Sequence, residues 1–194
     1  MKASPIQVTA ATVGVAALGL SMALGVYQSI LADGGLPNID LDYVPEIRAL
    51  EQSGDMEGAI RELRMATSVD AGNPGVANLL EEVATRAGDL DSRIVALRAQ
   101  LRTRPFDAEA RIRLSNAFVL LAREQSPGRA QRTLARAVWQ AEKAVQTAPD
   151  SALAHLALAQ ALRGAGQEQR AQAELSQAGR LDPALVQAAE AASP

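Results

Sequence analysis

The chain of 194 residues contains no cysteine, one histidine and only 3% aromatic side chains. The lack of cysteine excludes thiolate catalysis, a cysteine-ligated metal and covalent attachment of haem. It also suits an oxidising compartment, where an unpaired thiol is a liability. Lysine is nearly absent as well, since Lys2 and Lys143 are the only two.

Enzyme chemistry finds little support in the residues that are present. The single histidine, His155, lies in an apolar stretch with helical spacing. The sequence has neither a Gly-rich phosphate loop nor a clustered pair of carboxylates. We therefore predict a protein with no catalytic residues, no cofactor, no metal and no small-molecule substrate.

Glycine or alanine recurs where one helical pattern closes and the next one opens. The spacing is 34 residues from Gly54 to Gly88 and again to Ala122, and then 44 residues to Gly166. Positions at fixed distances beyond these four also agree in kind: Ala59, Arg93, Ala137, Ala171; Leu63, Leu97, Ala141, Leu175; Ala66, Gln100, Ala144, Ala178; Ala71, Pro105, Pro149, Pro183. Because the chain also lacks alternating strand patterns, the predicted fold class is all-α.

This pattern resembles the tetratricopeptide repeat (TPR), whose 34-residue unit is a helix, a tight turn, an antiparallel helix and a proline-marked stop. The resemblance covers roughly residues 40 to 183 and implies a solenoid of about four helix pairs. Residues 183–192 are expected to form a short capping helix that begins at Pro183. His155 occupies a place where the family often has a bulky aromatic residue, so we expect it in the core. Trp139 is expected to fill a helix crossing.

The first two units depart from the family pattern. Glu46 stands where the other units have leucine, and Glu81 and Arg93 stand where small residues are usual. Small residues at a crossing let two helix backbones approach, so we expect these units to be shortened or splayed. The third unit has ten extra residues between Ala122 and Ala137, including a Ser-Pro helix start, and is expected to be a lengthened helix pair.

Residues 3–32 carry no charge, and a bilayer span needs roughly 20 apolar residues. Lys2 precedes this stretch, whereas four acids follow it before the first base, Arg48, which favours a cytoplasmic amino terminus. We predict a transmembrane anchor at 1–32, a linker at 33–39 and a TPR-like domain at 40–194. The protein is then a single-pass protein of a bacterial inner membrane with periplasmic repeats. A signal peptide cleaved near Ala23 is the alternative, and it leaves the repeats on the same side.

Small residues recur on the predicted span at intervals of three or four. Such a stripe permits the close approach of another membrane helix, although an alanine-rich chain also scatters small residues by chance. The stripe consists of Ala10, Gly14, Ala17, Ser21 and Gly25.

Charge is unevenly distributed along the chain. Residues 33–91 hold thirteen acids and four bases, whereas residues 92–136 hold three acids and ten bases, all arginine. Arg129, Arg132 and Arg136 form a predicted basic face, for which a solvated helix surface is the default interpretation. Docking of an acidic partner or pairing between units are the alternatives. Nucleic acid is not an expected partner, because the chain is acidic overall and aromatic residues do not interleave the arginines.

The resemblance also implies a protein-binding surface. In TPR proteins the first helix of each unit lines the concave face, which corresponds here to Asn78, Glu82, Arg86, Ile112, Asn116, Val119, Leu153, Leu156, Gln160 and Arg163. The apolar members would anchor a helix or an extended peptide, and the amides would bond its backbone. The lysine-rich clamp by which some family members hold a terminal carboxylate is absent.

The layout, an anchor followed by a few repeats with one lengthened middle unit, resembles the membrane-anchored periplasmic TPR modules of cytochrome c maturation. That resemblance implies an assembly factor that holds a client polypeptide, for instance an apocytochrome. The alternative is a permanent accessory subunit of a membrane complex, with the span packed on partner helices. An enzyme is the third and least supported class.

Overall fold

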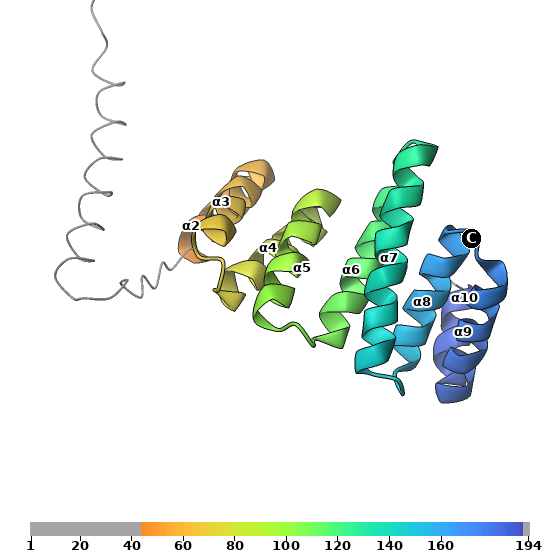
Figure 1. Ribbon diagram of the computed structural model, residues 1–194. Coiled ribbons are helices and arrows are strands. Elements are labelled where there is room, and N and C mark those ends of the chain that lie inside the picture. The colour runs from red at the N-terminus through yellow and green to blue at the C-terminus, as the bar shows by residue number, and fades with distance from the viewer. Residues whose placement is uncertain (1–43, 192–194) are drawn as a thin grey trace, which may run out of the picture. The chain divides into compact units, whose positions relative to one another are not determined.

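The computed structural model describes residues 44–191, and this part of the chain is built from nine α-helices joined by short connections (Figure 1). They are α2 (Val44–Gln52), α3 (Met56–Val69), α4 (Pro74–Ala87), α5 (Leu90–Thr103), α6 (Ala108–Arg123), α7 (Pro127–Thr147), α8 (Ala152–Gly164), α9 (Glu168–Leu181) and α10 (Pro183–Ala191). The predicted all-α class is confirmed for these residues. None of these helices is both long and apolar enough to cross a membrane. The predicted anchor, its stripe of small residues and the linker lie outside the described residues.

Successive helices form pairs, and the pairs stack along the chain. The pairs are α2 with α3, α4 with α5, α6 with α7, and α8 with α9, while α10 packs on α8 and α9. The predicted four TPR-like pairs and the capping helix are therefore confirmed. We call α2, α4, α6 and α8 the first helices, and α3, α5, α7 and α9 the second helices.

Glycine reverses the chain inside three of the four pairs. Gly54, Gly88 and Gly166 have φ angles of +83°, +73° and +75°, a left-handed conformation that residues with a Cβ atom rarely adopt. In the first two pairs the next helix begins at once, because Asp55 and Asp89 accept hydrogen bonds from backbone N–H groups of its first turn. The repeat spacing in the sequence is thus the spacing of these turns.

The third pair is lengthened, as predicted. Helix α6 has 16 residues and α7 has 21, whereas the pairs on either side have helices of 13 or 14. Helix α6 continues past Ala122 to Arg123, and α7 then begins with Pro127 in its first turn. The connected ends of α6 and α7 extend beyond the neighbouring helices in Figure 1.

The described part of α2 spans nine residues and begins at the first described residue, Val44. Its Glu46 is exposed, and the adjacent Ile47 is 1% exposed and supplies the one buried side chain of the helix. The expected shortening or splaying of this unit stays a prediction.

The repeat positions are buried as the register requires. Ala59, Ala137 and Ala171 are fully buried, while Arg93 at the equivalent place in the second unit is half-buried.

The apolar core is divided into two clusters. One joins α2, α3, α4 and α5 around Leu63 and Leu80. The other joins α5, α6, α7, α8 and α9 and includes Ile94, Leu97, Leu114, Phe118, Val138, Leu158 and Leu162. Helix α5 contributes to both, so it is the seam between the two halves of the stack.

The prediction that Trp139 fills a helix crossing is wrong. Its side chain is 51% exposed on α7, while the adjacent Val138 is buried. Successive helical residues point about 100° apart, so a one-residue difference in phase decides which of the two faces inward. The crossing itself is filled by Ala137 and Ala141, both fully buried.

Candidate protein-binding groove

The first helices are unequally spaced within the described part of the chain. Helix α6 packs against α8, whereas the backbone of α4 does not closely approach that of α6 or of α2. The space beside α4 and α6 is a groove of about 660 Å³. Every residue that lines it is polar, and most are charged: Asn78, Glu81, Glu82, Thr85, Arg86, Arg93, Arg104, Asp107, Glu109 and Arg113. We call it the first-helix groove.

A polar network occupies the position where the other units pack small residues. Gln100 is 1% exposed, and its amide nitrogen donates to Glu81 Oε2 at 2.8 Å. Arg113 on α6 donates to the amide oxygen of Gln100 at 3.2 Å, and its Nε lies 3.0 Å from Glu81 Oε1. The equivalents of Gln100 in the other units are Ala66, Ala144 and Ala178. Long side chains therefore stand between the second pair and α6, where alanine would let the helices close.

The groove carries both signs of charge on its walls. Arg113 also donates to Glu109 Oε1 at 2.6 Å, one turn earlier on α6. On the other wall, Arg86 pairs with Glu82 at 3.5 Å and with Glu51 of α2 at 2.5 Å. The second of these pairs ties α4 to α2, although their backbones do not touch. The lining is thus an internally paired surface, and its exposed rim offers donors and acceptors to a further polypeptide.

The predicted partner-binding residues fall into three groups. Asn78, Glu82 and Arg86 are exposed on α4 and line the first-helix groove. Ile112, Asn116 and Val119 are half-buried on α6, and Leu153, Gln160 and Arg163 are exposed on α8. Leu156 is only 8% exposed and belongs to the packed layer under α8. The role of these residues in binding stays a prediction.

Several lining residues were not among the predicted ones. Glu81 and Arg93 had been recognised only as departures from the repeat pattern, and Arg104, Glu109 and Arg113 carried no signal of their own. The departure of Glu81 and Arg93 from the repeat pattern was the available signal. Bulky polar residues at a helix crossing imply that the two helices are not closely packed through small apolar residues there.

His155 is part of the fold. It is 7% exposed, its Nδ1 lies 2.6 Å from Glu174 Oε2 on α9, and its Nε2 donates to the Pro149 carbonyl at 2.9 Å. Both ring nitrogens are thereby engaged, and the ring links α8 to α9 and to the connection before α8. The expected core position of this histidine is confirmed.

Arg129, Arg132 and Arg136 are exposed along α7, as the predicted basic face requires. Among the described residues, none of the three has an ion-pair partner. No ion pair within residues 44–191 therefore supports the alternative that these arginines pair with the acidic units of the same chain.

The fold is similar to that of solved TPR proteins. A structure of MamA from Desulfovibrio magneticus RS-1 aligns with a TM-score of 0.54 and 20% identity, over 73% of this chain and 74% of that one. A second crystal structure of MamA gives 0.55 and 17% over 79% and 77%. A thermophilic TPR protein of Thermus thermophilus gives 0.53 and 20% over 72% and 73%. No protein-family model and no curated protein sequence matches the chain significantly.

Likeness at such low identity establishes the fold alone. The described chain has a TPR-like fold of stacked helix pairs. A role in cytochrome c maturation stays a prediction.

The two leucines of α8 allow a test of how this helix is oriented. Leu156→Ala should lower the free energy of unfolding by about 2–4 kcal/mol, because it leaves a cavity under α8. Leu153 is 52% exposed, and Leu153→Ala should change that free energy by less than about 0.5 kcal/mol. Urea denaturation of the full-length chain, followed by circular dichroism, measures both. Equal losses would show that α8 is rotated from the orientation described.

Proposed function

We propose that this chain is a non-enzymatic scaffold that holds a polypeptide partner in the first-helix groove. The observation that carries the proposal is the separation of α4 from α6, which leaves a groove of about 660 Å³ on the face that TPR-like stacks use for binding. The rim of the groove carries both acidic and basic side chains. It therefore suits a polar or charged peptide segment, because each charge of the peptide can meet a complementary one.

Apolar anchoring comes from the adjoining face of α6 and α8. Leu153 is exposed there, and Ile112 and Val119 are half-buried beside the amide of Asn116. Such a surface lets a partner bury a few apolar side chains while the groove pairs with its charges. This is the mode of binding that we propose for the partner.

We further propose an anchored protein whose repeats lie outside a bacterial inner membrane. The uncharged residues 3–32 and the acidic flank that follows them support this arrangement. In this setting the preferred role is an assembly factor that holds a client, as in cytochrome c maturation. The stripe of small residues on the predicted span supports the alternative, a permanent subunit of a membrane complex.

A matched pair of threonines tests the groove. Thr85 lines it and Thr147 lies at the end of α7; both are exposed, and both bond the carbonyl one turn earlier in their helix. Thr85→Trp should fill the groove and reduce the partner recovered with the detergent-extracted full-length chain about tenfold, whereas Thr147→Trp should not. Quantitative mass spectrometry measures the recovery. Full recovery with Thr85→Trp would contradict binding in the groove.

The amount recovered with the unmodified chain separates the two roles. A permanent subunit gives constant, near-stoichiometric partners. An assembly factor gives substoichiometric clients that accumulate when their maturation is blocked.

The membrane arrangement has its own test. A reporter enzyme that is active only in the periplasm, fused after Pro194, should be active, because Lys2 precedes the predicted span whereas no base follows it before Arg48. The same fusion with a reporter that is active only in the cytoplasm serves as the control. Activity of the cytoplasmic reporter alone would refute the proposed location.

A further inference from the structure

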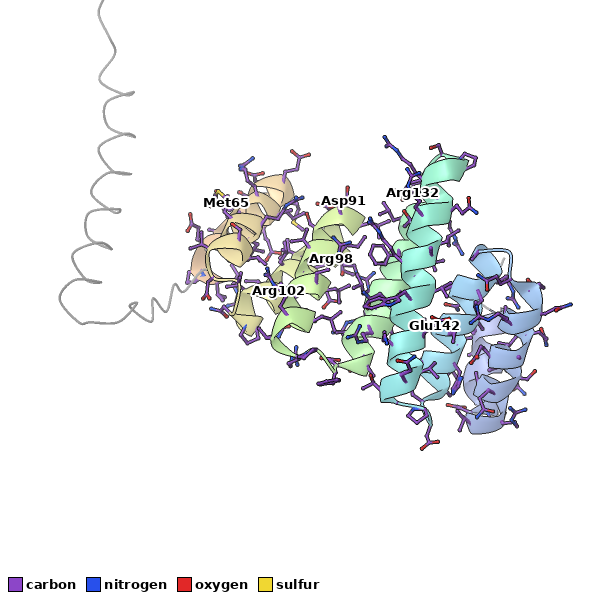
Figure 2. All side chains as sticks on the ribbon, in the orientation of Figure 1. Met65, Asp91, Arg98, Arg102, Arg132 and Glu142 are labelled. Atoms are coloured by element: carbon purple, nitrogen blue, oxygen red, sulfur yellow. The ribbon has the colours of Figure 1, made fainter. Side chains whose placement is uncertain are left out.

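A second concave surface lies on the side of the second helices. It is a cleft of about 360 Å³ lined by Arg98 of α5, Phe118 of α6, and Ala135, Arg136, Trp139 and Gln140 of α7. Phe118 is only 3% exposed and forms the apolar floor, whereas Trp139 is 51% exposed on the wall. Figure 2 shows Arg98 and Arg102 along α5 and Arg132 on the neighbouring stretch of α7. We call this surface the second-helix cleft.

Cationic side chains lie over both aromatic rings of the cleft. The Arg98 guanidinium lies 5.5 Å from the centre of the Phe118 ring. Arg111 and Lys143 lie 5.7 Å and 6.0 Å from the centre of the Trp139 ring. Arg111 is itself fixed by hydrogen bonds to Gln140 at 3.0 Å and to the Pro105 carbonyl at 2.6 Å. These contacts hold the indole in place while half of its surface stays exposed.

The positive charge of the cleft is not neutralised within residues 44–191. Neither Arg98 nor Arg136 has an ion-pair partner there, and Arg132 continues the same unpaired row along α7. Elsewhere in the described chain, arginines such as Arg86, Arg113 and Arg170 pair with carboxylates at 3.0 Å or less. An exposed tryptophan among unpaired arginines has the composition of an interface hot spot.

We propose that the second-helix cleft docks an acidic polypeptide segment. An apolar side chain of that segment rests on Phe118 and Trp139, and its carboxylates pair with Arg98 and Arg136 at the rim. Guanidinium groups match carboxylates with two parallel hydrogen bonds, which gives orientation as well as attraction.

The shape of the cleft favours a polypeptide over other anionic partners. An anionic membrane is a broad surface, whereas this site is recessed between two helices and has an apolar floor. A single-stranded nucleic acid is held by successive stacked bases, and the cleft exposes one aromatic ring. Apart from Phe118 of α6, the site uses residues of α5 and α7, while the first-helix groove is lined mainly by α4 and by other residues of α6. One chain can therefore hold two partners at once, an ability that does not depend on the proposed use of the groove.

Trp139 supplies a direct readout, because it is the only tryptophan of the chain. We would titrate the full-length chain, in neutral detergent micelles, with a short synthetic peptide of glutamate and leucine and follow the tryptophan emission. Burial of the exposed indole should give a saturable blue shift that weakens as salt is added. The same peptide with lysine in place of glutamate should give none.

The charge reversals Arg98→Glu and Arg136→Glu together should weaken this binding about tenfold or more. Arg180→Glu is the matched control, because Arg180 is exposed on α9, away from the cleft, and its reversal should leave the affinity unchanged. Far-ultraviolet circular dichroism establishes that each variant is folded.

Three results would overturn the proposal. The first is an equal shift with the lysine peptide. The second is retention of full affinity by the folded double reversal. The third is a shift produced by phosphatidylglycerol-doped micelles or by a single-stranded oligonucleotide while the acidic peptide gives none.

Discussion

The close approach of helices at alanine or glycine positions is the constraint on which the stack depends. A helix pair can bury its apolar face only if its neighbour comes near enough for leucines to interdigitate, and a Cβ methyl group is about the largest side chain that fits at such a crossing. Ala59, Ala137 and Ala171 meet this requirement in three of the four units. The second unit has Arg93 at the same place, and Gln100 where the others again have alanine. This difference coincides with the divided core, with the separation of the α4 backbone from that of α6, and with the groove beside them.

The polar network of the second unit makes this opening stable. A buried amide or carboxylate without a partner is strongly unfavourable, yet Gln100 and Glu81 satisfy each other and share Arg113 of the next unit. The network therefore holds the second and third units together at a fixed separation. A crossing closed by alanine would bury more apolar surface and would remove the groove. The second unit thus joins the two apolar clusters through α5 and at the same time opens the binding face.

Much of the architecture could be predicted because local chemistry determines it. Glycines at a fixed spacing mark turns with positive φ, and Ser126 followed by Pro127 marks the start of the long α7. The binding surface was harder to predict. Trp139 was misjudged because inward and outward positions differ by one residue of helical phase. The groove depends on how Glu81, Gln100 and Arg113 combine across two units, and a repeat pattern, which treats each unit alone, does not contain that information.

The claim that the second unit's bulky side chains hold α4 away from α6 can be tested by distance measurement. The chain has no cysteine, so Ala87→Cys on α4 and Arg123→Cys on α6, both exposed, introduce two unique sites for spin labels. Pulsed electron paramagnetic resonance then gives the distance between the labels. Our account predicts that Glu81→Ala, Arg93→Ala and Gln100→Ala together shorten this distance, whereas Asn78→Ala, Glu82→Ala and Thr85→Ala on the groove wall leave it unchanged. An unchanged distance in the first variant would contradict the account.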